Sequence, residues 1–291
     1  AFRVKISYVN VNLIAVDEAH CISEWGYDFR PSYLKIPELR QIMPEVPVLA
    51  LTASATLHVQ EDICKNLTLN LEPSFNIFRQ SIQRDNLVYV VRNAEDRVAE
   101  TAHILRNVPG TAIVYTRSRE KAELIARHLK EEYLFSADFY HAGLEPAERT
   151  KRQAEWTKGA TKVLCATNAF GMGIDKPNVR VVIHYDLPDT LEQYYQEAGR
   201  AGRDGETAYA VLLYSPDDKR KAKKRISDNY PEPSFIQNVY QKVADYLCVG
   251  AGSGLGHSFS IHLGEFCQSM KMPILPTQSA LQILAQMGYI A

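Results

Sequence analysis

The sequence LIAVDEAH at residues 13–20 decides the fold, because four apolar residues run directly into two adjacent carboxylates. This pattern is typical of a parallel strand that is buried on both faces, with Asp17 and Glu18 at its C-terminal end. Open α/β sheets bind their ligands at that edge. There, Asp17 would suit a nucleotide-bound Mg²⁺ and Glu18 an attacking water. Taken alone, however, an Asp-Glu pair is more often an ordinary acidic turn.

The composition is that of a globular protein. The chain has 291 residues, 46% of them hydrophobic and 23% charged, which suggests about two domains. The formal net charge of −1 gives no overall basic field, so any nucleic-acid surface must be local. We find no run of about 18 apolar residues and no signal peptide. The sequence therefore predicts a cytoplasmic protein without membrane partners, associated with the nucleoid if its source is bacterial.

Strand and helix patterns alternate between residues 79 and 216. Strands are expected at residues 87–91, 111–115, 137–140, 162–166, 179–184 and 208–214. Helices are expected at residues 95–107, 118–132, 146–158 and 190–199. This alternation predicts an α/β domain with a doubly wound parallel sheet, whose crossovers bring the C-terminal strand ends to one edge. We expect domains at residues 1–78, 79–216 and 217–291.

An aromatic-rich segment, CISEWGYDFRPSY at residues 21–33, follows the acidic pair. Its rings suit base stacking and its arginine suits phosphate, which favours single-stranded nucleic acid at Trp25, Phe29 and Arg30. Inward packing of Trp25 and Phe29 explains the segment about equally well. A short helix is expected at 32–43, a second buried strand at 47–51, and a helix at 57–66 with Thr56 as its N-cap.

Polar residues follow three of the strands expected in the second segment. Arg117, His141 and Thr167 each come just after a strand. Gly171 and Gly173 then form a Gly-x-Gly loop that suits phosphate contact. The signal is weak on its own, because the dinucleotide fingerprint G-x-G-x-x-G is incomplete when residue 176 is lysine.

The sequence QEAGRAGRDG at residues 196–205 places two arginines three residues apart. On a helix, Arg200 and Arg203 would share a face, and beside a triphosphate they would stabilise the charge of phosphoryl transfer. By itself, a solvated glycine-rich helix end explains the two arginines better.

The last segment starts with KRKAKKR at residues 219–225, which has six basic residues in seven. A solvated helix face is the commoner explanation, and a grip on a phosphate backbone is the alternative. Helices at 234–247, 259–270 and 277–287, followed by a strand starting at 288, would make a winged-helix-like unit. Five cysteines with no C-x-x-C pair predict neither disulfides nor zinc, and we expect Cys248 and Cys267 to be buried thiols.

Together these motifs resemble the RecQ family of DNA helicases, in the second helicase superfamily. DEAH at residues 17–20 matches the family's DEAH box, and the aromatic-rich segment matches the loop that follows it. Further motifs are matched in order by residues 52–56, 112–117, 140–144, 163–177 and 196–205. The resemblance implies RecA-like lobes that bind ATP and Mg²⁺ and act on single-stranded and forked DNA. It also implies 3′–5′ unwinding in DNA recombination and repair.

The resemblance assigns roles to individual residues. It implies Mg²⁺ binding by Asp17, water activation by Glu18, and γ-phosphate contacts by Arg200 and Arg203. The nucleotide site would further include His20, Gly171, Asp175 and Gln196. Contact with DNA would come from Trp25, Phe29, Arg30, Arg117, His141 and Thr167.

The sequence departs from the family pattern in two ways. No G-x-x-x-x-G-K-[ST] phosphate loop occurs, and only twelve residues precede residue 13. We therefore expect a partial first lobe, a complete second lobe, and a fragment without ATPase activity of its own. No four-cysteine zinc module follows the second lobe. A non-catalytic nucleic-acid-binding module and an RNA helicase of the same superfamily stay open as alternatives.

Overall fold

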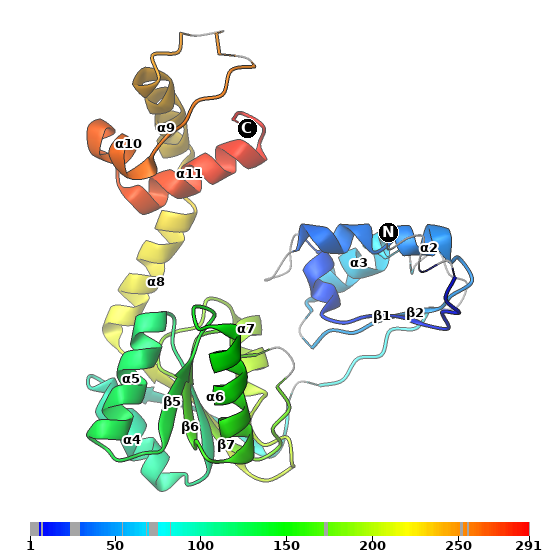
Figure 1. Cartoon of the computed structure of the whole chain (residues 1–291), viewed down its shortest axis with the longest axis vertical. Coiled ribbons are helices and arrows are strands. Elements are labelled where there is room, and N and C mark those ends of the chain that lie inside the picture. Colours follow the sequence, from blue (N-terminus) through cyan, green and yellow to red (C-terminus); the bar gives the residue numbers. More distant parts are fainter. Residues whose placement is uncertain are drawn as a thin grey trace. The chain divides into compact units, whose positions relative to one another are not determined.

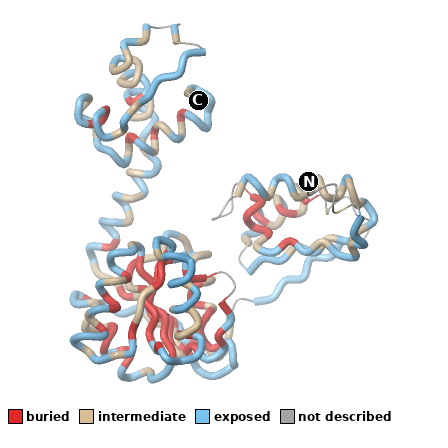
Figure 2. Tube along the Cα trace, in the orientation of Figure 1, coloured by how far each residue is buried: buried red, intermediate tan, exposed pale blue. Residues whose placement is uncertain are grey.

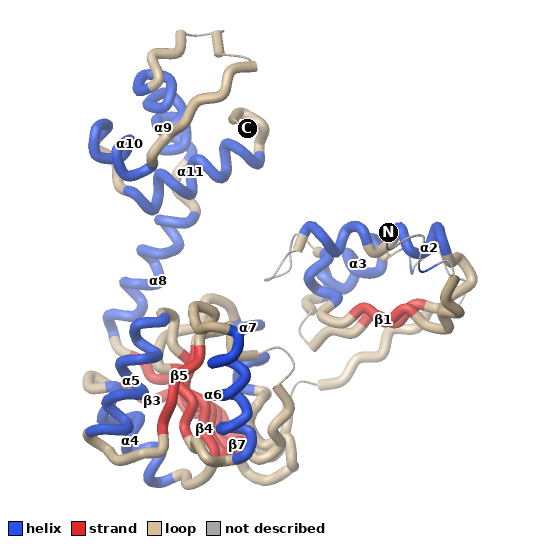
Figure 3. The backbone as a smooth tube through the Cα atoms, viewed as in Figure 1, coloured by secondary structure: helices blue, strands red, loops and turns tan. Residues whose placement is uncertain are grey.

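A computed structural model describes residues 6, 8–23, 30–53, 55–67, 69, 75–81, 83–171, 174–250, 253–254 and 256–290. The chain divides into two compact units, Ala1–Tyr214 and Ser215–Ala291. The first unit contains a two-stranded and a six-stranded sheet, and the second is helical (Figure 3).

The smaller sheet pairs β1 (Ile14–Val16) with β2 (Val48–Ala50) in parallel. Val16 and Ile22 pack against α3 (Leu57–Asn66). The expected N-cap is confirmed, because the Thr56 hydroxyl accepts a hydrogen bond from the Val59 amide at 3.3 Å. The expected burial of β1 on both faces is wrong, since Leu13 is 50% exposed and Ala15 is exposed as well. The described residues supply β1 with one neighbouring strand only, so much of its surface stays uncovered.

The single helix expected at residues 32–43 is also wrong. A 3₁₀ helix, η2 (Pro31–Lys35), precedes a short α2 (Glu38–Ile42), and Pro37 is the N-cap between them. Ile36 and Pro37 both have right-handed helical dihedral angles, but proline has no amide hydrogen, so Pro37 cannot donate a helical hydrogen bond to the preceding turn, which explains the break.

The larger sheet confirms the predicted doubly wound arrangement. Its strands are β3 (Leu87–Asn93), β4 (Thr111–Tyr115), β5 (Ala137–Tyr140), β6 (Val163–Ala166), β7 (Val179–His184) and β8 (Ala208–Tyr214). The order is β3-β8-β7-β4-β6-β5, and every neighbouring pair is parallel. Figure 1 labels β5, β6 and β7 of this sheet. The central strands are fully buried, as an all-parallel sheet requires (Figure 2).

Helices cover both faces of this sheet. One core contains α4 (Arg97–Asn107) and α5 (Arg119–Glu131), and the other contains Trp156 of α6 (Pro146–Lys158) and Ala198 of α7 (Leu191–Ala198). Side-chain caps start α4, α5 and α7 from Asp96, Ser118 and Thr190. Because each cap fixes where its helix begins, the loops that precede the helices have defined positions at the sheet edge.

The second unit contains α8 (Pro216–Asn229), α9 (Pro233–Tyr246), α10 (Leu263–Met270) and α11 (Ile274–Gln286). Val239, Ala280 and Leu284 form its small core. The strand expected from residue 288 is not present in the described residues 288–290, so the wing of a winged helix is not seen there. In the described part of the chain, no group of three or more metal-ligating side chains occurs. None of the described helices is both long and apolar enough to cross a membrane.

Candidate functional site

The turn after β1 holds the acidic pair in an unusual conformation. Glu18 has a φ of 48° and a ψ of 45°, in the left-handed region that a glutamate rarely adopts. Its amide donates a 2.8 Å hydrogen bond to Oδ1 of Asp17, and the amide of Ala19 donates to the Leu51 carbonyl at 2.9 Å. These bonds compensate for the backbone strain. Strain of this kind is concentrated at functional sites, which makes this turn a candidate.

His20 lies beneath this turn and is 1% exposed. Its Nδ1 is 3.0 Å from Oγ1 of Thr52 and 3.4 Å from Oε2 of Glu18. The imidazole therefore links the β1 turn to the loop after β2, through a hydroxyl of the 52–56 motif. Glu18 and Ala53 line a pocket, whereas His20 is not among its lining residues.

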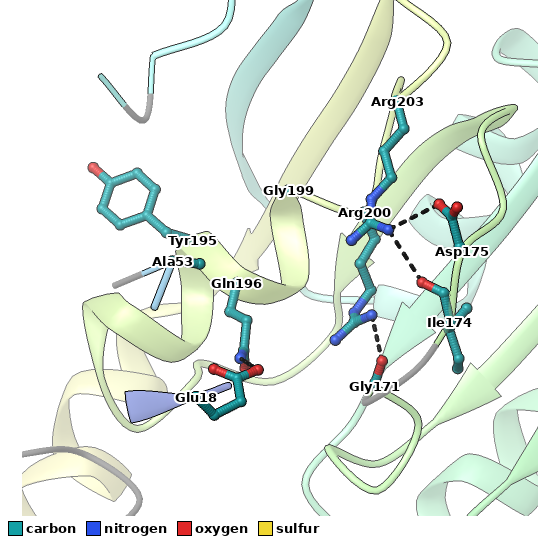
Figure 4. Close-up of a pocket in the computed structure, with 10 residues that line it drawn as sticks. All are labelled: Glu18, Ala53, Gly171, Ile174, Asp175, Tyr195, Gln196, Gly199, Arg200 and Arg203. Carbon is teal, nitrogen blue, oxygen red and sulfur yellow. Dashed lines mark hydrogen bonds and ion pairs between the residues drawn. The ribbon is translucent and has the colours of Figure 1, made fainter. Parts of the chain in front are cut away.

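Helix α7 ends at Ala198, and Arg200 and Arg203 lie in the turns that follow it. Nη1 of Arg200 donates to the Gly171 carbonyl at 2.6 Å. Nη1 of Arg203 donates to the Ile174 carbonyl at 3.2 Å and to Oδ1 of Asp175 at 3.1 Å (Figure 4). Both guanidinium groups are thus held by the segment that follows β6, and this arrangement does not need the shared helical face.

A pocket of about 380 Å³ collects many of these groups (Figure 4). Its lining consists of Glu18, Ala53, Gly171, Ile174, Asp175, Tyr195, Gln196, Gly199, Arg200 and Arg203. Nε2 of Gln196 donates to Oε1 of Glu18 at 3.3 Å. Six of the fourteen residues predicted for the site therefore line one pocket.

Arg200 is the most informative group in this lining. Its side chain is buried, at 8% exposure, and its Nε has no hydrogen-bond partner. Among the described residues, no carboxylate forms an ion pair with Arg200. Buried charges are normally paired. A buried guanidinium with an unused N–H, at the wall of a pocket, is therefore suited to an anionic ligand.

Glycine at position 171 is required by this arrangement. A Cβ there would lie 2.8 Å from Nη2 of Arg200, closer than real contacts allow. Tyr115, which interacts with Arg200, is buried, and its hydroxyl donates to the Phe170 carbonyl at 2.8 Å. Burial raises the pKa of Tyr115 strongly, although Arg200 beside it acts in the opposite direction. The phenol therefore stays neutral, and it leaves the charge of Arg200 uncompensated.

Two residues that the sequence did not suggest hold the arginine turns in place. Nη1 of Arg84 donates to the Gly199 carbonyl at 3.1 Å, and Nη2 hydrogen-bonds to the Gly202 carbonyl. Nδ2 of Asn86 also donates to Gly202, at 2.7 Å. Gly202 has a φ of +61°, and a Cβ there would lie 2.8 Å from Cβ of Ala208. The glycine and its two donors together fix the path of the chain between Arg200 and Arg203.

A buried polar cluster anchors α7 from the opposite side. Glu197 accepts from Nε2 of Gln193 at 2.9 Å and lies 3.0 Å from Nε2 of His184. Tyr194 packs on the same imidazole, with ring centroids 4.7 Å apart. Burial raises the pKa of Tyr194 to about 12, with smaller contributions from Tyr89 and Tyr195. No single motif indicated this cluster, because its members come from β7, α7 and β3.

Four of the residues predicted to contact DNA are described, and the pocket lining contains none of these four, namely Arg30, Arg117, His141 and Thr167. Arg117 forms an ion pair with Asp189, and its amide donates to Asp186 at 3.1 Å. His141 is buried, with Nε2 2.8 Å from Oε1 of Glu123, and Thr167 is buried at the end of β6. The Arg30 amide donates to the Cys21 carbonyl at 2.8 Å. Trp25 and Phe29 lie outside the described residues.

The pocket also contains residues that the sequence prediction omitted. Tyr195 precedes Gln196 on α7 and Gly199 is the C-cap of that helix, whereas Ala53 and Ile174 complete the apolar part of the lining. Their positions inside the 52–56, 163–177 and 196–205 motifs, or next to them, were the available signal. Small and apolar residues carry no chemistry of their own, so residue type gave no reason to select them.

Known proteins resemble this chain in the same regions. A family model described as "Helicase conserved C-terminal domain" matches residues 96–205. The chain is 42% identical to the probable ATP-dependent DNA helicase RecS of Bacillus subtilis over 217 residues. This alignment covers 74% of the chain and 43% of RecS. The chain is also 44% identical to the ATP-dependent DNA helicase RecQ of Haemophilus influenzae over 249 residues. This alignment covers 84% of the chain and 40% of that helicase.

The chain thus spans about two-fifths of the length of these curated relatives. Among solved structures, Saccharomyces cerevisiae Dbp5 bound to RNA and ADP BeF3 matches with a TM-score of 0.57 and 19% identity, covering 77% of this chain and 59% of Dbp5. That likeness shows a shared fold. The sequence identity to RecS and RecQ, together with the helicase domain match, shows that the chain belongs to the RecQ family of helicases.

Proposed function

We propose that the protein hydrolyses ATP at the pocket beside Arg200 and uses the reaction to unwind DNA in the 3′–5′ direction, in recombination and repair. The observation that carries the proposal is the buried Arg200 guanidinium, which has an unused N–H and no carboxylate partner among the described residues. A phosphate group supplies the missing negative charge and accepts from an arginine fork. The names of the relatives, ATP-dependent DNA helicases, support the same reading.

The catalytic groups divide between two parts of the first unit. Asp17 and Glu18 lie in the turn after β1, and Arg200 and Arg203 lie after α7. Glu18 would orient the attacking water, and the arginines would stabilise charge on the transferred phosphoryl group. Asp17 is exposed, and its second carboxylate oxygen accepts no hydrogen bond from the described residues, so it suits Mg²⁺. Bound Mg²⁺ would neutralise phosphate charge.

The remaining pocket residues would couple nucleotide binding to the conformation of the chain. Gly171 and Asp175 each accept a hydrogen bond from one of the arginines. Gln196 contacts Glu18, and His20 links Glu18 to Thr52. A phosphate that pairs with Arg200 or Arg203 competes with these contacts. The segment after β6 would then respond to the nucleotide, which is a coupling between two sites.

Single-stranded and forked DNA are the proposed substrates. We assign base stacking to Trp25 and Phe29, and backbone contacts to Arg30, Arg117, His141 and Thr167. Residues 1–78 and 79–216 would form the two lobes of the motor, and residues 217–291 an accessory domain. DNA that aligns the lobes would stimulate hydrolysis, because Glu18 and the arginines must act on one nucleotide.

The test is ATP hydrolysis by the full-length protein, with and without single-stranded DNA. We expect DNA-stimulated turnover that Glu18→Gln abolishes while a fluorescent ATP analogue still binds, since the substitution removes the water-orienting carboxylate and keeps its size. Unwinding is then compared on DNA and RNA duplexes with matched 3′ and 5′ overhangs. Turnover without Glu18 would remove its role, preference for RNA would identify an RNA helicase, and absence of any turnover would leave a binding module.

A further inference from the structure

Helix α8 has a positively charged surface, and none of its residues lines the pocket beside Arg200. Its sequence, PDDKRKAKKRISDN, has six basic residues and three acidic ones, in a chain whose formal net charge is −1. The acidic side chains do little to balance it. Asp218 is buried in the capping box, where it accepts from the Ser215 amide at 2.7 Å. Asp217 pairs with Arg220 at 3.2 Å and with Lys221 at 4.0 Å.

The three lysines at positions 219, 223 and 224 are exposed and form no ion pair among the described residues. Like charges four residues apart repel each other on a helix, by roughly 0.2–0.5 kcal/mol per pair. Lys219 and Lys223 form one such pair, and Arg220 and Lys224 form another. Favourable interaction with the helix dipole does not explain them, because no basic residue lies in the last turn of α8. A bound polyanion would relieve the repulsion.

Two exposed apolar side chains lie on the same face of the helix as Lys219 and Lys223. Lys219, Lys223, Ile226 and Tyr230 follow a four-three-four spacing, which places them in one row along a helix. Ile226 is 62% exposed and Tyr230 is 76% exposed. The Tyr230 amide still donates to the Ile226 carbonyl at 2.8 Å, so the helical path extends to this residue. The row covers about 16 Å and ends in an aromatic ring.

We propose that this row and the neighbouring Lys224, a surface that we call the α8 face (Lys219, Lys223, Lys224, Ile226 and Tyr230), bind single-stranded nucleic acid. The lysines would contact phosphates, and Tyr230 would stack on a base. An anionic lipid surface also attracts basic helices, but it requires a broad apolar face, and α8 exposes only these two large apolar side chains. The inference rests on the proposed function only for the kind of polyanion, and it needs neither ATP binding nor hydrolysis.

The experiment measures binding of the purified chain to a fluorescein-labelled oligothymidine by anisotropy, at salt concentrations between about 50 and 200 mM. The test variant is the triple substitution Lys219→Gln, Lys223→Gln and Lys224→Gln, because glutamine keeps the helix propensity of lysine. The matched control changes the exposed Lys130, Lys151 and Lys158 to Gln, with the same loss of charge. We expect the test variant to bind at least about tenfold more weakly. Its logarithmic salt slope should be lower by about two units, and the control should stay close to the unmodified protein.

A second pair of variants tests the stacking. Tyr230→Ala should weaken binding by about fivefold or more, and Tyr230→Phe should retain it, because the ring rather than the hydroxyl makes the contact. On a strand of abasic sites, Tyr230→Ala should have no effect. Equal losses in the two lysine variants, an undiminished Tyr230→Ala effect on the abasic strand, or tighter binding to duplexes or anionic vesicles would each overturn the proposal. Unwinding that survives such a result would leave the proposed function intact.

Discussion

Nε2 of His184 lies 3.0 Å from Oε2 of Glu197, and both side chains are almost fully buried. The pair joins the end of β7 to the last turn of α7, one residue after Gln196 and three before Arg200. Nδ1 of His184 is buried without a hydrogen-bond partner. The imidazole therefore places its N–H on Nε2, where Glu197 accepts it, because an unmade donor would be the costlier group to bury.

The first prediction concerns this pair. Glu197→Gln presents an amide to His184 and favours the tautomer with the hydrogen on Nδ1, which has no acceptor. We expect the free energy of unfolding to fall by about 1–3 kcal/mol, measured by urea denaturation. Glu132→Gln is the control, because Glu132 pairs with His128 on an exposed face. Its effect should stay below about 0.5 kcal/mol. Equal effects of the two substitutions would mean that burial of the pair contributes nothing.

The second prediction concerns the glycine beneath Arg200. Gly171→Ala places a Cβ 2.8 Å from Nη2 of Arg200, so the guanidinium must leave its position against the Gly171 carbonyl. We expect kcat for ATP hydrolysis by the full-length protein to fall by at least about tenfold, since correctly placed arginines contribute about 10³–10⁵ in such reactions. Gly264→Ala is the control, because its Cβ would meet no atom within 4 Å. An unchanged kcat in Gly171→Ala would argue against a catalytic position for Arg200.

The third prediction tests the support behind the arginine turns. Arg84→Lys keeps the charge but cannot reach the carbonyls of Gly199 and Gly202 together, because an ammonium lacks the guanidinium fork. We expect a lower kcat with the KM for ATP changed by less than about twofold, since ATP itself would not touch Arg84. Arg92→Lys, at an exposed position on β3, should behave as the unmodified protein. A change in KM alone would indicate that Arg84 contributes to binding instead.

The fourth prediction is a pH dependence. Burial raises the pKa of Tyr194 to about 12 in the folded protein, from the ordinary tyrosine value of 10.0. A raised folded-state pKa favours the neutral phenol, so the stability it provides is present below pH 10 and is lost as the pH rises towards 12. We expect Tyr194→Phe to reduce this loss. Difference titration of tyrosinate absorbance between the two proteins should show one group ionising near pH 12, and a difference centred at pH 10 would contradict the assignment.

Much of the larger sheet could be predicted from sequence. Each strand from β3 to β8 was expected within a few residues, because buried parallel strands read as short apolar runs between caps and glycines. The exposure of β1 could not be predicted in this way. The sequence of a strand shows how hydrophobic the strand is, whereas its burial depends on how many strands and helices pack against it. Likewise, the sequence contains Pro37 within a helical pattern, but it did not indicate that the helix would be divided there into η2 and α2.

The candidate site also contains residues that the sequence indicated and residues that only the structure showed. Asp17, Glu18, Arg200 and Arg203 could be selected by residue type and motif, because phosphoryl transfer needs carboxylates and fixed positive charges. Arg84 and Asn86 could not, since each is 115 or more residues from the carbonyls it holds. The sequence by itself determined which residues can do chemistry and which segments form parallel strands. Only the tertiary structure decided that Gly171 and Arg200 meet, because β7 and β8 are neighbouring parallel strands and the segments that lead into them therefore lie side by side.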